Sequence, residues 1–313
     1  MLNIKPSENL NIYGLNFYFN QIINLYDQKK MPNRILLSGK KGLGKSTLAY
    51  HIINCILSKD EDFEYSKDKF SINIKNKSYV LLNNQTHPNF HLIDLAEDKK
   101  NIDISQIRQM ITFTNKSSFN NKPKLILLDN VEYLNKNSVN ALLKVIEEPN
   151  QNIYFILIHN NEKKILPTLK SRCLMFKIHL SFEEIINITS TLINDNPLKL
   201  INQDLINYYN SPGEYVKLVN FADEKDIDLK KSTLKDVLNF LISGAHYKKN
   251  KYVKNLTINF IELFFLKEYK YSDNNNLLLN FYHVFIDKIH NTEKFNLDEE
   301  SLFLEFKSKL LNE

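Results

Sequence analysis

The sequence predicts an α/β domain with an open, mostly parallel sheet, followed by a region that is helical throughout. Three observations support this fold class. A glycine-rich phosphate-binding pattern follows the first apolar strand, apolar strands then alternate with helices up to about residue 180, and no convincing strand comes after that point. The 313 residues, of which 43% are hydrophobic and 25% charged, suffice for a globular protein of two or three domains.

The first elements form a strand–loop–helix unit around the glycine-rich pattern. Apolar residues at helical spacing predict an amphipathic helix over 15–26, before the short apolar strand 34–38. The loop Gly-Lys-Lys-Gly-Leu-Gly-Lys-Ser occupies 39–46, and a helix is expected over 46–58. This loop fits the P-loop signature G-x-x-x-x-G-K-[ST], and the helix after it would direct its N-terminus at a bound anion. The setting favours nucleotide binding over a chance match.

Each residue type in the loop has an expected role. The residues expected to bind nucleotide are Gly39, Gly42, Gly44, Lys45, Ser46 and Thr47. The glycines allow a tight turn, so that backbone N–H groups can point at phosphate oxygens. The Lys45 ammonium is expected between the outer phosphates, and the Ser46 hydroxyl is expected to ligate Mg²⁺.

The rest of the first half alternates strands and helices. The polar stretch 59–77 is interpreted as a loop or an insertion. Further strands are expected at 87–94, 124–129, 153–158 and 173–178. Helices are expected from Asp103 onward and over 135–148. The 124–129 strand is an almost continuous apolar run, as in a parallel sheet that is covered on both faces.

The chain changes character after Leu180. The segment Ser181-Phe-Glu-Glu184 is a capping box that opens a helix. Helices are expected near 182–194, 202–209, 213–222, 232–243, 252–269, 276–290 and 297–312. This pattern places one domain boundary near 180 and a second, softer one in the charged stretch 222–228.

A carboxylate is expected beside the P-loop, because such sites need one to hold Mg²⁺. Asp129 follows the apolar strand and fits that need together with Ser46, although it could also be an ordinary turn residue. Many hydrolysing enzymes of this type carry Glu at the next position, where it polarises the attacking water. Here Asn130 stands there, and an amide cannot accept a proton, so hydrolysis should be slow or absent. Glu132 is close in sequence but is expected to point elsewhere.

One arginine, Arg172, lies directly before the last expected strand. Arg172 is in the segment Leu-Pro-Thr-Leu-Lys-Ser-Arg-Cys, which ends at Cys173. The plain interpretation is a surface residue or a cation at a helix C-terminus. The more specific interpretation is an arginine finger. A planar, permanently charged guanidinium can stabilise the charge that builds on a phosphoryl group bound by a neighbouring subunit.

These motifs, in their order along the chain, resemble a known family. GKKGLGKST, DISQIR, LILLDNVEYLNKNSVNALLKVIEEP and ILPTLKSRC follow one another as in bacterial DNA polymerase III clamp-loader subunits, which are related to replication factor C. Within that family, the delta-prime branch is the most similar, ahead of tau/gamma. The strong motifs cover about 30–180, and Ser211-Pro212-Gly213 also resembles a delta-prime segment.

The resemblance implies a domain organisation and a set of partners. It implies an AAA+ P-loop nucleotide-binding domain at 1–180, a small helical lid at 181–224 and an all-α collar domain for oligomerisation at 225–313. The collar would assemble a hetero-pentamer with tau/gamma-like and delta-like subunits. That ring uses ATP binding to open the sliding clamp and place it on primed DNA during replication.

The resemblance also assigns roles to single residues. Arg172, in the middle of the SRC motif, would reach the ATP site of an adjacent subunit. The chain would be an accessory subunit of the DNA polymerase III holoenzyme, a nucleotidyltransferase complex, with little or no ATPase of its own. ATP or ADP with Mg²⁺ would be the cofactor wherever its own site is occupied.

Three departures from the family pattern limit what carries over. Clamp-loader subunits commonly have a zinc-binding cysteine cluster after the P-loop helix, but only Cys55 is present here, so no zinc is expected. Active ATPase subunits carry a lid arginine that touches nucleotide, where this chain has Glu214. The sensor position at the end of the fourth strand is His159 or Asn160, of which Asn160 is favoured because its amide can hydrogen-bond a phosphate oxygen or water.

Other functional classes stay open. An autonomous AAA+ ATPase, such as a helicase loader, would share the P-loop. A P-loop kinase acting on a small molecule would need an arginine-rich lid, and this chain has few arginines. A scaffold that binds no nucleotide is a third alternative. No apolar run approaches the roughly 18–20 residues of a membrane span, and the first ten residues lack an apolar signal core, so a cytoplasmic protein without membrane contact is expected.

Overall fold

The computed structural model describes residues 5–96, 99–147, 152–249, 251–271, 275–295 and 298–311. The chain forms two compact units. The first comprises residues 1–194 and 211–217, and the second comprises 195–210 and 218–313. The division into a nucleotide-binding domain, a lid and a collar stays a prediction.

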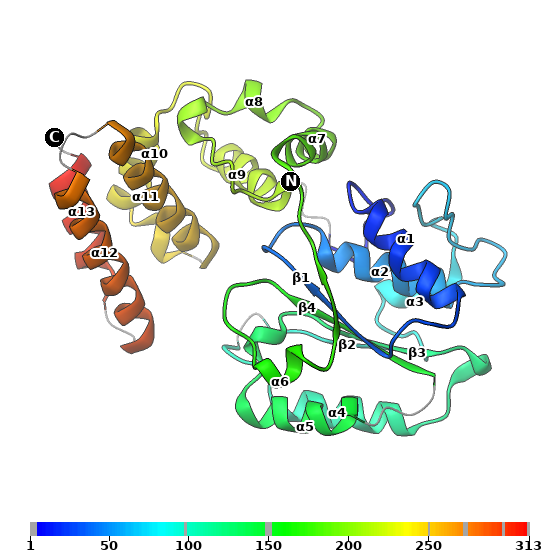
Figure 1. Ribbon diagram of the computed structural model, residues 1–313. Coiled ribbons are helices and arrows are strands. Elements are labelled where there is room, and N and C mark those ends of the chain that lie inside the picture. Colours follow the sequence, from blue (N-terminus) through cyan, green and yellow to red (C-terminus); the bar gives the residue numbers. More distant parts are fainter. Residues whose placement is uncertain are drawn as a thin grey trace. The chain divides into compact units, whose positions relative to one another are not determined.

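The first unit is built on a sheet of five parallel strands in the order β2-β3-β4-β1-β5 (Figure 1). The strands are β1 Arg34–Ser38, β2 Phe90–Ile93, β3 Lys124–Leu128, β4 Ile153–His159 and β5 Leu174–Lys177. In this register Leu36 lies between Leu157 of β4 and Met175 of β5. The predicted α/β class with a mostly parallel sheet is confirmed, and all five strands lie where they were expected.

Helices cover both faces of this sheet. Figure 1 shows α1 (Asn16–Asp27), α2 (Lys45–Leu57) and α3 (Lys77–Asn83) on one face. It shows α4 (Ile104–Asn115), α5 (Lys136–Glu147) and α6 (Pro167–Lys170) on the other. Short 3₁₀ turns at η1 (Phe119–Asn121) and η2 (Val131–Tyr133) precede and follow β3, and α7 spans Phe182–Ile193. The double cover explains why the central strands are apolar on both sides.

Helix α3 follows the polar stretch that was interpreted as a loop. It begins at Lys77 because the Asn76 side chain accepts a hydrogen bond from the Tyr79 N–H, which satisfies one of the free donors of the first turn. Helix α7 begins as expected, since Ser181 and Glu184 form both hydrogen bonds of the capping box.

A buried lysine joins β3 to the end of α4. Lys124 begins the strand, and its ammonium donates to the carbonyls of Phe113 at 2.6 Å and Thr114 at 3.4 Å, and also to that of Lys116. These carbonyls belong to the last turn of α4, where helical partners are lacking. The ammonium also lies 4.9 Å from the centre of the Phe113 ring. Desolvation lowers the pKa of Lys124. Its ammonium is nonetheless hydrogen-bonded to these carbonyl acceptors.

The second unit is helical in its described part. Its elements are α8 Pro197–Leu200, η3 Gln203–Leu205, α10 Leu234–Ser243, η4 His246–Lys248, α11 Lys251–Tyr271, α12 Asn275–Phe295, α13 Glu300–Phe306 and η5 Lys307–Leu311. Helix α9 (Pro212–Glu224) has residues in both units. The buried rings of Phe264, Phe265, Phe285 and Phe306 pack against one another.

One predicted helix of this region is wrong. The range 202–209 contains only the 3₁₀ turn η3. The Asn202 side chain accepts the Asp204 N–H at 2.9 Å, and the Asn207 side chain accepts the Tyr209 N–H at 3.0 Å. Such local bonds between Asn and the backbone compete with helical ones, so the chain turns twice instead of continuing.

Candidate functional site

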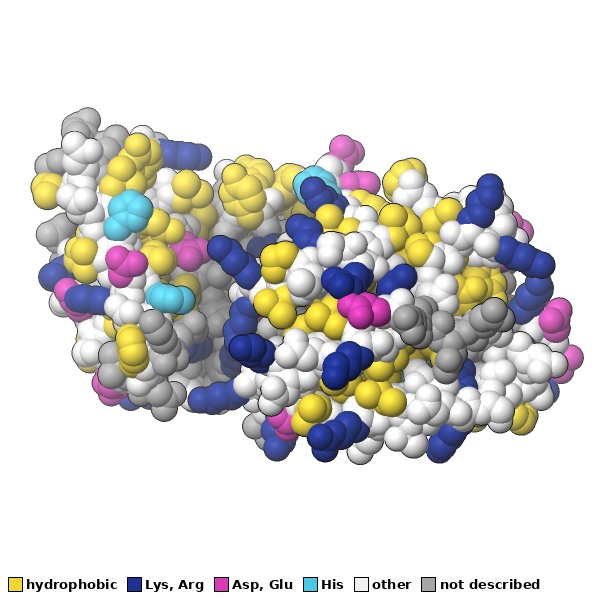
Figure 2. Space-filling view, turned by 60° about the horizontal axis from the view of Figure 1, so that its bottom comes forward, with side chains coloured by type: hydrophobic (Ala, Val, Ile, Leu, Met, Phe, Trp, Pro, Cys, Tyr) yellow, Lys and Arg dark blue, Asp and Glu magenta, His cyan; other side chains and the backbone are white. Residues whose placement is uncertain are grey.

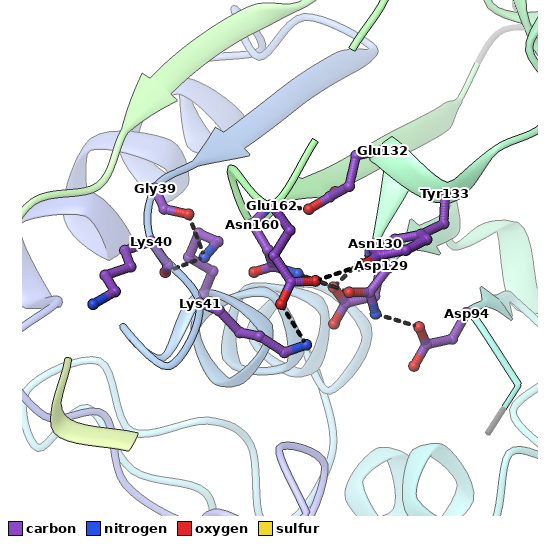
Figure 3. A network of polar contacts seen from close by, with 11 residues as sticks. Gly39, Lys40, Lys41, Asp94, Asp129, Asn130, Glu132, Tyr133, Asn160 and Glu162 are labelled. Atoms are coloured by element: carbon purple, nitrogen blue, oxygen red, sulfur yellow. Dashed lines mark hydrogen bonds and ion pairs between the residues drawn. The ribbon is translucent and has the colours of Figure 1, made fainter. Parts of the chain in front are cut away.

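The parallel sheet brings the predicted site residues together at one edge. The P-loop follows β1, Asp129 follows β3 and Asn160 follows β4, and β3, β4 and β1 are neighbours in the sheet. Because the strands are parallel, their carboxyl ends meet at the same edge, where open α/β sheets bind ligands. Figure 3 shows these residues around the N-terminal end of α2.

The loop itself has the backbone that its glycines permit. Gly42 and Gly44 have φ angles of 83° and 85°, in the left-handed region, and Gly44 is the N-cap of α2. Lys45 is only 2% exposed. Its ammonium donates to the carbonyls of Gly39 at 2.9 Å and Lys40 at 2.6 Å. Desolvation lowers the pKa of Lys45 to about 8, against the opposing effect of the nearby Asp129 carboxylate.

The two residues expected to hold Mg²⁺ contact each other. The Ser46 hydroxyl donates a hydrogen bond to Oδ2 of Asp129. A hydroxyl and a carboxylate are oxygen ligands of the kind that Mg²⁺ takes beside a nucleotide. The neighbouring Thr47 hydroxyl accepts a hydrogen bond from the Asn9 amide at 3.2 Å. This donor set fits a magnesium–nucleotide complex in which Ser46 and Asp129 would hold the metal.

Both polar atoms of the Asn130 amide form hydrogen bonds. Its Nδ2 donates to Oδ1 of Asp94 at 2.7 Å, and its Oδ1 accepts from Nδ2 of Asn160 at 3.0 Å. Asp94 follows β2, the strand next to β3, and sequence reasoning missed it. An acidic residue directly after an apolar strand was the available signal. Desolvation and the charge of Asp129 raise the pKa of the Asp94 carboxyl.

Asn160 lies beside Asp129, whereas His159 is turned toward other partners. The Asn160 amide, in a residue that is 8% exposed, is 3.4 Å from Oδ1 of Asp129. His159 contacts the Ser38 hydroxyl at 3.1 Å and the Lys163 carbonyl at 2.9 Å. This geometry favours Asn160 as the residue that would meet a phosphate or a water.

Glu132 was expected to point away from the site, and this expectation is wrong. Its Oε1 accepts the backbone N–H of Asn160 at 2.9 Å, and its side chain is buried (Figure 3). The cause is Asn130, which is left-handed with a φ of 57° and so turns the chain back toward the end of β4. Glu132 thus holds the main chain of Asn160.

Both additional lysines of the loop are paired with carboxylates. Lys41 is 3.0 Å from Oε1 of Glu162, whose other oxygen accepts from the Tyr133 hydroxyl at 2.8 Å (Figure 3). Lys40 is 2.7 Å from Oε2 of Glu214. Glu214 stands where active ATPase subunits carry the lid arginine, and it contacts the P-loop through Lys40.

Arg172 lies on the other side of the sheet from the P-loop helix. It follows α6, on the face covered by α4 and α5, whereas α2 covers the opposite face (Figure 1). Its guanidinium pairs with Glu147 at 2.8 Å and donates to the Thr168 carbonyl at 3.0 Å. The side chain is 36% exposed. Arg172 is thus outside the group of residues that surrounds the chain's own P-loop.

Two further findings concern metals and membranes. Among the residues that the structure describes, no group of three or more His, Cys, Asp or Glu side chains is placed to hold a metal ion. Cys55 is buried in α2. None of the helices in the described ranges combines the length and the apolar character that crossing a bilayer requires.

A P-loop before α2, an acidic residue after β3 and a polar amide after β4, on a parallel sheet with helices on both faces, define the P-loop class of α/β proteins. A family model described as "DNA polymerase III, delta subunit" matches residues 15–181. The chain belongs to this family, and its relatives identify it as a clamp-loader subunit of the delta-prime type.

The curated relatives described here are subunits of DNA polymerase III, two of them delta′ and one gamma. DNA polymerase III subunit delta′ of Buchnera aphidicola subsp. Schizaphis graminum is 30% identical over 289 residues, which is 84% of each chain. Subunit delta′ of Pseudomonas aeruginosa is 33% identical over 138 residues, 44% of this chain and 40% of the relative. Subunit gamma of the same Buchnera is 30% identical over 256 residues, 81% of this chain and 63% of the relative. The replication and clamp-loader assignment is therefore confirmed.

Solved structures are similar over long stretches but at low scores. A gamma-subunit-related protein of Thermotoga maritima gives a TM-score of 0.47 at 15% identity, over 91% of this chain and 96% of that one. The clamp-loader delta protein of Bacillus subtilis gives 0.33 at 14% identity, over 92% and 83%.

Proposed function

We propose that this clamp-loader subunit contributes ring structure and an arginine finger, rather than strong ATP hydrolysis of its own. Its partners would be tau/gamma-like and delta-like subunits in a hetero-pentamer. The pentamer would use ATP to load the sliding clamp onto primed DNA. Partners of the clamp-loader type are supported by the gamma and gamma/tau relatives.

The position of Arg172 carries this proposal. Its guanidinium lies on the sheet face opposite the P-loop helix, is partly exposed, and pairs only with groups of α5 and α6 among the contacts described above. A guanidinium in this position can bind and stabilise a nucleotide phosphate that is bound by a neighbouring subunit. Contact with the neighbour would require it to leave Glu147, an exposed pair whose loss costs at most about 1 kcal/mol.

The chain's own loop would bind ATP or ADP with Mg²⁺ weakly or as a structural ligand. The glycine loop, Lys45, Ser46, Thr47 and Asp129 supply groups for such a complex, with Asn160 close by. Nucleotide, when bound, would supply the phosphates that these groups face. Hydrolysis should be slow, because Asn130 is an amide whose two polar atoms are already bonded.

The finger is tested by substituting Arg172 with Ala in a reconstituted complex with clamp and primed DNA. We expect ATP turnover at the neighbouring subunit's site, which Arg172 would reach, to fall by about tenfold or more, since arginine fingers contribute strongly to phosphoryl transfer. Lys170→Ala, which removes a neighbouring positive charge on α6, is the matched control and should leave turnover within about twofold. Unchanged turnover in Arg172→Ala would contradict the trans role.

A further inference from the structure

The phosphate loop carries two lysines that its signature does not require, and each is paired with a carboxylate from another segment of the same unit. Glu214, in the first turn of α9, lies 2.7 Å from Lys40. Glu162, after β4, lies 3.0 Å from Lys41. The third ammonium of the loop, that of Lys45, donates to the loop's own carbonyls. All three cations therefore have acceptors within the protein.

Both carboxylates are held by additional donors. The Ser211 N–H donates to Oε2 of Glu214 at 2.7 Å, and the Ser211 hydroxyl donates to the same oxygen at 3.2 Å. The Tyr133 hydroxyl donates to Oε2 of Glu162 at 2.8 Å. A carboxylate that accepts several hydrogen bonds keeps its charge in a fixed place.

The backbone also keeps the Glu214 segment against the loop. The Gly213 N–H donates to the Gly42 carbonyl at 3.1 Å. A Cβ added to Gly42 would lie 2.4 Å from the Ser211 hydroxyl oxygen, so the two segments meet without room for a side chain. The main chain that carries Glu214 is therefore held against the loop, close to Lys40.

Resting on the nucleotide binding proposed above, we infer that Glu162 and Glu214 form a carboxylate brace that sets the affinity of the loop for phosphate low. The brace neutralises Lys40 and Lys41, so that neither offers a free positive charge to a phosphate. A nucleotide must compete with both carboxylates for the same lysines. The opposite arrangement, in which the carboxylates aim the lysines at phosphate, predicts an effect of opposite sign.

The expected size of the effect follows from Coulomb's law. These side chains are partly exposed, so their interactions are screened nearly as in bulk water, where one charge several ångströms from a phosphate changes an affinity by about three- to tenfold. Removing both charges should tighten binding by about ten- to fiftyfold. Salt weakens such interactions, so the difference should shrink at high ionic strength.

The test is a titration of the full chain with fluorescent ADP and Mg²⁺ at low ionic strength. The variants are Glu162→Gln, Glu214→Gln and the double variant, each of which keeps an acceptor for the Tyr133 or Ser211 donor. Asp27→Asn is the matched control, because it unpairs Lys67 in an exposed pair of 2.7 Å elsewhere in the first unit. Lys45→Ala serves as the non-binding reference, and thermal melts check that every protein is folded.

The brace is supported if each single variant binds about three- to tenfold more tightly and Asp27→Asn stays within twofold. Binding seen only in the double variant, and lost when Lys45→Ala is added, also supports it. Equal or weaker binding by both single variants, with wild-type binding that Lys45→Ala abolishes, overturns the brace and leaves the nucleotide site intact. Tightening by Asp27→Asn of the same size overturns it as well. Absence of binding in all proteins contradicts both proposals.

Discussion

Two buried histidines, His51 in α2 and His87 before β2, are each held in one protonation state by their neighbours. His51 Nε2 lies 3.0 Å from the Asn9 carbonyl, which can only accept, so Nδ1 is left to accept from the Tyr65 hydroxyl at 3.0 Å. His87 Nδ1 accepts the Asn89 N–H at 3.1 Å. Burial lowers the pKa of both histidines to about 4. Both imidazoles are therefore neutral in the folded protein at neutral pH.

This leads to a pH dependence of stability. The unfolded chain binds a proton at each histidine near its ordinary pKa of about 6.5, whereas the folded chain binds it only near pH 4. The free energy of unfolding should therefore be fully retained above about pH 6.5 and fall by about 1.4 kcal/mol per pH unit for each histidine below it. Urea unfolding between pH 7 and pH 5 measures this slope.

A histidine variant identifies the source of the slope. His87→Gln should reduce this slope by up to about 1.4 kcal/mol per pH unit, which is the contribution of one histidine. An unchanged slope in His87→Gln would show that other groups carry the acid sensitivity.

At the scale of elements, the end of α4 depends on a strand residue. Lys124 begins β3, and its buried ammonium donates to carbonyls in the last turn of that helix. We expect Lys124→Met to lower the free energy of unfolding by about 2–4 kcal/mol, because the carbonyls lose a charged donor in a place that water does not reach. Urea unfolding of the full chain provides the measurement. Lys144→Met, at an exposed position of α5, should change it by less than about 0.5 kcal/mol.

Most elements of the first unit could be predicted because their signals are local. The strands are short apolar runs, the P-loop is a fixed spacing, and α7 begins at a capping box. The range 202–209 could not be assigned correctly, because its apolar spacing resembles a helix while Asn202 and Asn207 form turns. Side chain to backbone bonds of this kind are visible only when the turn is built.

The candidate site shows the same division between local and long-range signals. Asp129 could be expected from its place after a strand. The contacts of Asp94 and Glu162 could not, because they depend on the strand order β2-β3-β4-β1 and on how each loop returns. Glu132 was misjudged because an Asn tolerates the left-handed conformation without requiring it, so the turn at Asn130 could not be told from the sequence. Sequence spacing therefore identified the loop and its metal carboxylate, but not the side chains that surround them.

At the scale of the whole molecule, the proposal concerns a subunit that works within an assembly. The isolated chain should hydrolyse far fewer than a few ATP molecules per second. The position that would polarise the attacking water holds Asn130, whose amide is already hydrogen-bonded at both polar atoms. When the chain is isolated from its source cells under gentle conditions, tau/gamma-like and delta-like subunits should be recovered with it. Fast turnover by the chain alone, or recovery of a homohexamer, would favour an autonomous AAA+ ATPase instead.

The self-contained bonding of Lys45 has a consequence for how such a sequence evolves. The buried ammonium links two carbonyls of its own loop, and the Ser46 hydroxyl bonds to Asp129. Replacing Lys45 would take a charged donor from the buried Gly39 carbonyl, and replacing Ser46 would take a donor from Asp129; both changes cost folding free energy. Selection for a stable fold would then preserve the glycine–lysine–serine motif over generations even in a lineage that had ceased to use nucleotide.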